Sequence, residues 1–222
     1  MKPSRHILIT LLLLLVYWAF IYHIAIFAPL DLAVFAFSEE GTIEILSPLL
    51  WFLLALFYLF GRMALPTRLA SAVMAVLFGL REMDMHKSFF QVEGQSTHFL
   101  RSNFYFTDIE PLSHKIIGGI FALAILALAF YLIKTFVISF KRSRKPRNPA
   151  YGYTALGFVL LVISKFADRL NSDLQEIFNI TLPPRSVVLV QAFEESTEMI
   201  LPVILCIAVI LYERQTLPDS KH

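Results

Sequence analysis

The chain has 222 residues, of which 57% are hydrophobic and 16% are charged, and its mean hydropathy is +0.68. Soluble domains carry about a quarter charged residues, so this composition excludes an ordinary soluble domain and predicts an integral membrane protein. The formal net charge is +2, and the sequence has no Walker loop, dinucleotide-binding fingerprint or nucleic-acid-binding motif, so we expect no nucleic-acid partner.

Six apolar stretches of about 20 residues or more predict membrane-spanning helices. Together they predict an all-α, polytopic helical bundle in which residues 1–222 form a single transmembrane domain. The first stretch is too long for the core of a signal peptide, so we expect it to be retained as a helix. The third is the weakest, because the polar run from Arg81 to Lys87 occupies its end. The predicted spans are residues 7–30, 43–65, 69–90, 115–140, 153–170 and 186–212.

Lysine and arginine residues in the connections predict the orientation of the bundle, because they accumulate on the cytoplasmic side. The connector 141–149 is strongly basic, so we expect it to lie in the cytoplasm, where it meets anionic membrane lipids. Segment 91–113 then lies on the outer face, and its aromatic part is suited to the membrane interface. The pattern predicts cytoplasmic termini in a bacterial-type inner (plasma) membrane.

The sixth predicted span is apolar along most of its length but contains Glu194, Glu195 and Glu198. A carboxylate within the membrane is costly unless it is paired, protonated or bound to a cation. At about 100° per residue, the three glutamates and Gln191 lie on one arc of the helix. Because lipid cannot satisfy such a polar stripe, we expect it to face the protein interior.

The predicted orientation brings charged residues from four spans into the outer leaflet. Acidic residues exceed lysines and arginines there by nine to four, and this excess predicts a bound cation, protonated carboxylates or both. The acidic residues are Glu39, Glu40, Glu44, Glu82, Asp84, Asp168, Glu194, Glu195 and Glu198, and the basic residues are Arg81, Lys87, Lys165 and Arg169.

A divalent metal ion, zinc or iron, is the cation that we expect. Glu82-x-x-x-His86 places a carboxylate and an imidazole on adjacent turns of one helix, and helical bundles bind transition metals with such pairs. His98 and His114, both on the outer side, are further candidate nitrogen ligands. The predicted metal ligands are Glu44, Glu82, His86, Asp168, Glu195 and Glu198.

This site predicts a metal-dependent membrane hydrolase, or a related enzyme, that acts on a lipid or lipid-linked substrate from the outer side. The candidate catalytic residues are Glu82 and Glu198, as general bases, and Lys165, which can hold an oxyanion or phosphate. Lys165 can instead be a structural counter-ion of Asp168 or the glutamates. The layout is similar in architecture to the alkaline-ceramidase-like membrane hydrolases, but the last span lacks the paired His-x-x-x-His of that family.

Two other classes of function stay open at this point. A cation or proton transporter could use the acidic cluster as its binding site, although the inner halves of the second, fourth and sixth spans are almost uninterrupted apolar sequence. A non-catalytic assembly or accessory subunit could use the charges to hold helices together or to dock a protein partner, whose identity the sequence does not indicate.

Overall fold

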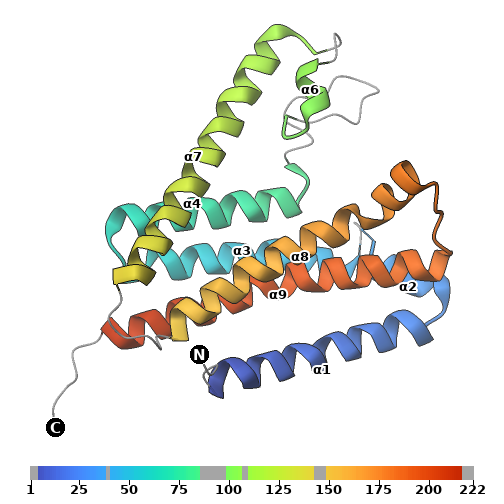
Figure 1. Cartoon of the computed structure of the whole chain (residues 1–222), viewed down its shortest axis with the longest axis horizontal. Helices are drawn as coiled ribbons and strands as arrows, with labels where there is room; N and C mark the ends of the chain where they lie inside the picture. Colours follow the sequence, from blue (N-terminus) through green and yellow to red (C-terminus); the bar gives the residue numbers. More distant parts are fainter. Residues whose placement is uncertain (1–4, 39–40, 86–98, 107–109, 143–148, 217–222) are drawn as a thin grey trace. The chain divides into compact units, whose positions relative to one another are not determined.

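The computed structural model describes residues 5–38, 41–85, 99–106, 110–142 and 149–216, and the side chains of 42–44, 102–103, 142, 215 and 216 are not described (Figure 1). Within these residues the chain is 88% helix and contains no strand, which confirms the all-α prediction.

Four helices are long and apolar enough to cross a membrane, judged by length and composition. They match the first, fourth, fifth and sixth predicted spans. They are α1 (Arg5–Phe27), α7 (Leu112–Arg142), α8 (Pro149–Phe178) and α9 (Pro184–Thr216).

The second and third predicted spans correspond to two shorter helices, α3 (Thr42–Leu59) and α4 (Leu65–Glu82). Each has 18 residues, and at 1.5 Å per residue each is about 27 Å long, slightly less than the hydrocarbon core of a bilayer. In α4 the charged residues Arg68, Arg81 and Glu82 further reduce the apolar length. The structure therefore supports four of the six predicted spans, and the location of the termini stays a prediction.

Proline and polar residues explain where the helices begin and end relative to the predicted spans. α1 ends at Phe27 because Pro29 disfavours helical geometry in the residue before it, and the short helix α2 (Leu30–Ala36) begins directly after Pro29. α8 continues eight residues beyond the predicted end at Leu170, through a polar stretch in which Arg169 Nε lies 3.5 Å from Asp173 Oδ1. A second short helix, α6 (Ser102–Phe106), lies within the predicted interfacial segment.

The chain forms two compact units, Met1–Leu50 with Lys145–His222, and Trp51–Arg144. In the first unit, α8 and α9 make the most extensive contact and run antiparallel, side by side (Figure 1). Gly157 makes this close approach possible, because a Cβ at that position would lie 2.7 Å from Leu205 Cδ2. The two helices therefore form an apolar hairpin, and polar residues of both helices meet within it.

Helix α1 packs antiparallel on α9 in the same unit. The indole of Trp18 contacts the ring of Phe193 at a centroid distance of 5.5 Å, and the guanidinium of Arg185 donates to the carbonyls of Ala25 and Ala28, each at 2.9 Å. These carbonyls lie in the last turn of α1 and just after it, where main-chain acceptors lack helical partners and a cation is favoured by the helix dipole. Arg185 thus joins the end of α1 to the start of α9.

In the second unit, α3 and α4 contact each other through Trp51 and Phe78, whose rings stack at 4.6 Å. α4 also packs on α7. The aromatic segment 99–106 covers the start of α7, where a Cβ on Gly118 would lie 2.8 Å from Phe99 Cβ and 3.1 Å from Phe104 Cε1.

Candidate intramembrane polar site

Five polar residues of α8 and α9 face each other in the first unit. Ser164, Lys165 and Asp168 lie within about one turn of α8, and Glu194 and Glu198 are one turn apart on α9. Because the helices are antiparallel, Ser164 meets Glu198 and Asp168 meets Glu194. We call these five residues the α8–α9 cluster.

Glu198 is the most buried carboxylate of the α8–α9 cluster, with 8% of its side chain exposed. Its Oε1 accepts a hydrogen bond of 2.8 Å from Ser164 Oγ, and Ser164 is fully buried. The same oxygen lies 2.7 Å from Lys165 Nζ. The hydroxyl and the ammonium both contact one carboxylate oxygen, and these contacts offset the cost of burying that carboxylate between apolar helices.

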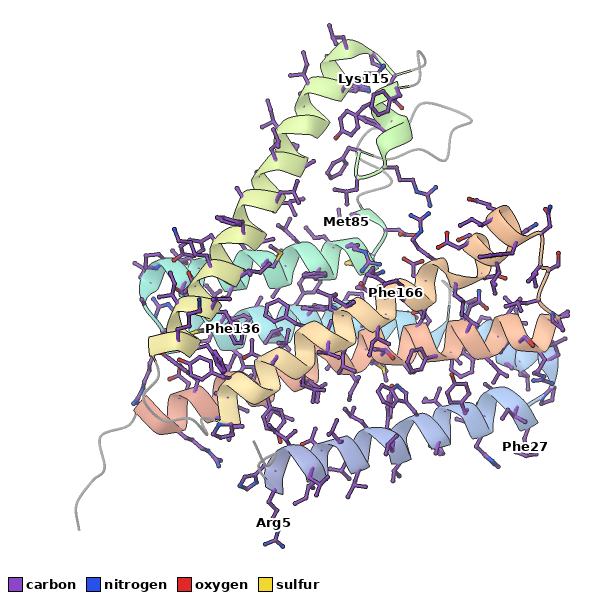
Figure 2. All side chains as sticks on the ribbon, in the orientation of Figure 1. Arg5, Phe27, Met85, Lys115, Phe136 and Phe166 are labelled. Carbon is purple, nitrogen blue, oxygen red and sulfur yellow. The ribbon has the colours of Figure 1, made fainter. Side chains whose placement is uncertain are left out.

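Lys165 connects the buried and the exposed parts of the cluster. Its Nζ lies 3.1 Å from Asp168 Oδ2 as well as 2.7 Å from Glu198 Oε1. The side chains of Lys165 and Asp168 are 37% and 46% exposed, so the cluster opens at the surface of α8. The neighbouring Phe166, labelled in Figure 2, is also strongly exposed on this helix.

Glu194 adds a third carboxyl group to the cluster. It is half-buried, hydrogen-bonds to Asp168, and lies within electrostatic range of Glu198 and Lys165. The cluster therefore has three carboxyl groups and one ammonium, so the acidic excess predicted from the sequence persists on these two helices.

The helix that carries Glu198 is itself held by hydroxyl groups. Thr197 Oγ1 and Ser196 Oγ donate to the carbonyl of Phe193 at 2.6 and 3.2 Å, and Tyr17 of α1 donates to the carbonyl of Ser196 at 3.1 Å. Ser196 and Thr197 are fully buried. The bond from Tyr17 thus joins this stretch of α9 to α1, whereas the bonds of Ser196 and Thr197 are made within α9.

Beyond Ser164 and Glu198, the contact between α8 and α9 is apolar. The buried residues that follow along the helix pair are Leu160, Leu201 and Ile204, and Gly157 then packs against Leu205. The α8–α9 cluster consequently opens to one side of this pair and is closed on the other by a packed hydrophobic contact.

The structure brings three of the predicted site residues together, Lys165, Asp168 and Glu198. Glu195 is half-buried on α9, about 100° around the helix from Glu194. Glu82 lies in the second unit, where its Oε1 is 3.1 Å from Arg81 Nη1 and its side chain is buried. The side chain of Glu44, together with all of His86 and His98, lies outside the described residues.

The predicted metal ion gains no direct support from this geometry. In the part of the chain that the structure describes, no group of three or more His, Cys, Asp or Glu side chains is arranged so that it could bind one metal ion. In the α8–α9 cluster the Lys165 ammonium lies between two of the carboxylates.

The sequence analysis did not identify Ser164, the fully buried residue that donates a hydrogen bond to Glu198. A usable signal was present, because Ser164 is one turn before Asp168 and directly before Lys165 in an otherwise apolar run. It also missed Glu110, which pairs with His114. Glu110-x-x-x-His114 repeats the spacing of Glu82-x-x-x-His86, so the same search would have found it.

No family model, no curated protein and no solved structure matches this chain. Its function must therefore be argued from its own residues.

Proposed function

We propose that this membrane protein is an enzyme that acts on a lipid or lipid-linked substrate, with the α8–α9 cluster as its active site. The observation that carries the proposal is the position of Glu198, a buried carboxylate that is held by Ser164 and Lys165 on two packed helices. Rigid helices position a reacting group more accurately than loops do, and glutamate is a common general base in enzymes.

In this proposal each residue has a distinct role. Glu198 acts as general base toward water or a substrate hydroxyl that enters from the exposed side of the cluster. Lys165 stabilises negative charge that develops on the substrate, and Ser164 holds the Glu198 carboxylate in place. Asp168 holds the Lys165 ammonium near the opening, because its Oδ2 lies 3.1 Å from Nζ.

Two features support a substrate that approaches through the membrane. The opening lies on the surface of α8, beside exposed apolar side chains such as Phe166. The other end of the helix pair is closed by Leu160 and Leu201. A site that is open on one side suits turnover of a bound molecule better than passage of an ion through this helix pair.

The test uses purified full-length protein with vesicles made from the total polar lipids of the expression host, and mass spectrometry of the lipids over time. We expect native protein to convert one lipid class, and Glu198→Gln to lower the initial rate by at least about 100-fold, the usual contribution of a general base. Asp173→Asn is the matched control, because Asp173 is an exposed acid further along α8 and should leave the rate unchanged.

The same purified proteins also allow a test of the metal ion that the sequence predicts. Elemental analysis of native protein and of the Glu198→Gln variant shows whether a metal is bound and whether this cluster holds it. The proposed roles of Glu198 and Lys165 do not depend on the result.

One observation favours a second candidate function, a non-catalytic assembly subunit. Lys165 of α8 contacts both Asp168 of its own helix and Glu198 of α9, so it also clamps the two helices. If no lipid is converted and Glu198→Gln lowers only the free energy of unfolding, the clamp explains the cluster and the enzyme proposal is wrong.

A further inference from the structure

A second polar pair lies at the start of α7, in the other unit of the chain. The side chain of Glu110 is fully buried, and its Oε2 lies 3.2 Å from Nδ1 of His114, one turn further along. Within the part of the chain that the structure describes, its other oxygen, Oε1, has no hydrogen-bond partner. Lys115, labelled in Figure 2, marks this end of the helix.

The unpartnered Oε1 is the informative feature. A buried carboxylate oxygen without a donor is costly, and native structures almost always satisfy such atoms with protein groups, ordered water or an ion. The hydrogen bond between His114 and Oε2 leaves this cost in place. Among the described residues, none donates a hydrogen bond to Oε1 of Glu110.

The side chain of Glu110 is fully buried, whereas that of His114 is 35% exposed. Glu110 lies two residues before α7, and His114 and Gly118 lie one turn apart on the first turns of that helix. Phe99 and Phe104 cover the helix at Gly118. The cover is held in place by Tyr105, whose hydroxyl donates to the carbonyl of Phe99 at 2.6 Å. An ion between Glu110 and His114 would thus bind in a partly dehydrated setting, where its attraction to a carboxylate is stronger than in water.

The distance between the two side chains matches that of two ligands on one metal ion. Zinc–nitrogen and zinc–oxygen bonds of about 2.0–2.2 Å place two adjacent ligand atoms about 3.0–3.5 Å apart. Glu110 Oε2 and His114 Nδ1 are 3.2 Å apart, and a carboxylate with an imidazole is a common ligand pair for divalent transition metals. The same ion can reach Oε1 if the carboxylate binds through both oxygens.

We propose that Glu110 and His114 bind a divalent transition-metal ion such as zinc at the start of α7, with water completing its coordination. This site is separate from the α8–α9 cluster and does not depend on the function proposed for it. It uses two protein ligands from the described residues, and the ion would satisfy the orphaned oxygen of Glu110.

The test is a titration of tag-free, full-length protein, stripped of metal with a chelator, with Co²⁺ followed by its visible absorption and by competition with Zn²⁺. We expect one equivalent of Co²⁺ to bind to native protein. Glu110→Gln and His114→Ala should each weaken binding by at least about tenfold, since even loss of a residue that only supports a ligand costs 10- to 100-fold.

Two control variants separate this site from other ligands. His23→Gln removes an exposed histidine of α1, and Glu198→Gln removes the buried acid of the α8–α9 cluster, so both should bind Co²⁺ as native protein does. Glu110→Gln keeps the size and shape of the side chain, and size-exclusion chromatography verifies that it is folded.

Absence of Co²⁺ binding by native protein, or equal affinity in Glu110→Gln and His114→Ala, would overturn the proposal. Loss of binding only in Glu198→Gln would also overturn it, because that result would assign the metal to the other cluster. Failure of the lipid assay described above has no bearing on this outcome.

Discussion

At the scale of single residues, Glu198 has the most demanding environment in the first unit. It is buried in an apolar helix pair, where Ser164 and Lys165 both contact its Oε1. Replacing either of them should therefore have a larger effect than replacing a polar residue at the surface of the same helix.

We expect Ser164→Ala to lower the free energy of unfolding by about 1–2 kcal/mol, because it removes a donor to a buried carboxylate oxygen. Ser172→Ala is the matched control, since Ser172 is an exposed serine of α8 that donates only to the carbonyl of Arg169, and it should change the free energy by less than about 0.5 kcal/mol. Unfolding in mixed SDS and detergent micelles measures both. Equal effects of the two substitutions would show that the hydrogen bond to Glu198 contributes nothing.

A double-mutant cycle tests the ion pair between Lys165 and Glu198. Lys165→Met leaves a buried carboxylate without its cation, and we expect a loss of about 1–3 kcal/mol, below the value for a fully buried pair because Lys165 is 37% exposed. Combining it with Glu198→Gln should cost less than the sum of the single substitutions by about 1 kcal/mol, as measured by the same SDS unfolding. Strict additivity would mean that the two charges do not interact.

At the scale of elements, the contact between α8 and α9 determines the geometry of the cluster. Gly157 allows the helices to approach closely at their apolar end, and Tyr17 of α1 donates to the carbonyl of Ser196 at the polar end of α9. Small residues at helix contacts are a common means of close packing in membranes. The separation of Ser164 from Glu198 is thus set by residues that are not themselves part of the cluster.

We expect Gly157→Val to lower the free energy of unfolding by about 1–3 kcal/mol, because its side chain would overlap Leu205 and Leu201 and push the helices apart. Gly119→Ala is the control, since a Cβ there meets only Tyr105 Cε1 at 3.8 Å, an ordinary contact. It should be neutral or slightly stabilising. A cysteine pair at Ser164 and Glu198 that cross-links in the native background but not with Gly157→Val would show the separation directly.

At the scale of the whole molecule, the number of membrane crossings is the main open property. Four helices have the length and composition of spans, whereas α3 and α4 are shorter, and the connection between them contains Gly61 and Arg62. If α3 and α4 both cross, the positive-inside pattern places this connection in the cytoplasm. If neither helix crosses, the connection between α3 and α4 lies within the membrane or on its outer side.

Labelling of single cysteines distinguishes these arrangements. In a Cys206→Ser background, we expect Ser143→Cys in the basic connector and Thr67→Cys at the start of α4 to react with a membrane-impermeant maleimide only after the cells are permeabilised. Ser172→Cys at the polar end of α8 should react in intact cells. Reaction of Thr67→Cys in intact cells would rule out six crossings with this orientation.

Much of the candidate site could be predicted from residue spacing within single helices. Lys165 with Asp168, and Glu194 with Glu198, each lie about one turn apart, and the cost of a carboxylate in an apolar helix made them candidates. The pairing of Ser164 with Glu198 could not be predicted, because it depends on the relative alignment of two antiparallel helices. Ser164 is uncharged and lies in an apolar stretch, so the cost of burying a charge does not identify it as a site residue.

Composition and periodicity alone determined that this chain is an all-helical membrane protein and that its last helix carries a polar stripe, because the cost of placing charge in lipid depends only on residue type and position along a helix. Tertiary structure alone decided which residues form hydrogen bonds and ion pairs with that polar stripe. Lys165 reaches two carboxylates at once and Ser164 donates to Glu198 because Gly157 lets α8 and α9 pack closely in one register. The contact between Ser164 and Glu198 joins residues 34 positions apart, and no local pattern in the sequence encodes that alignment.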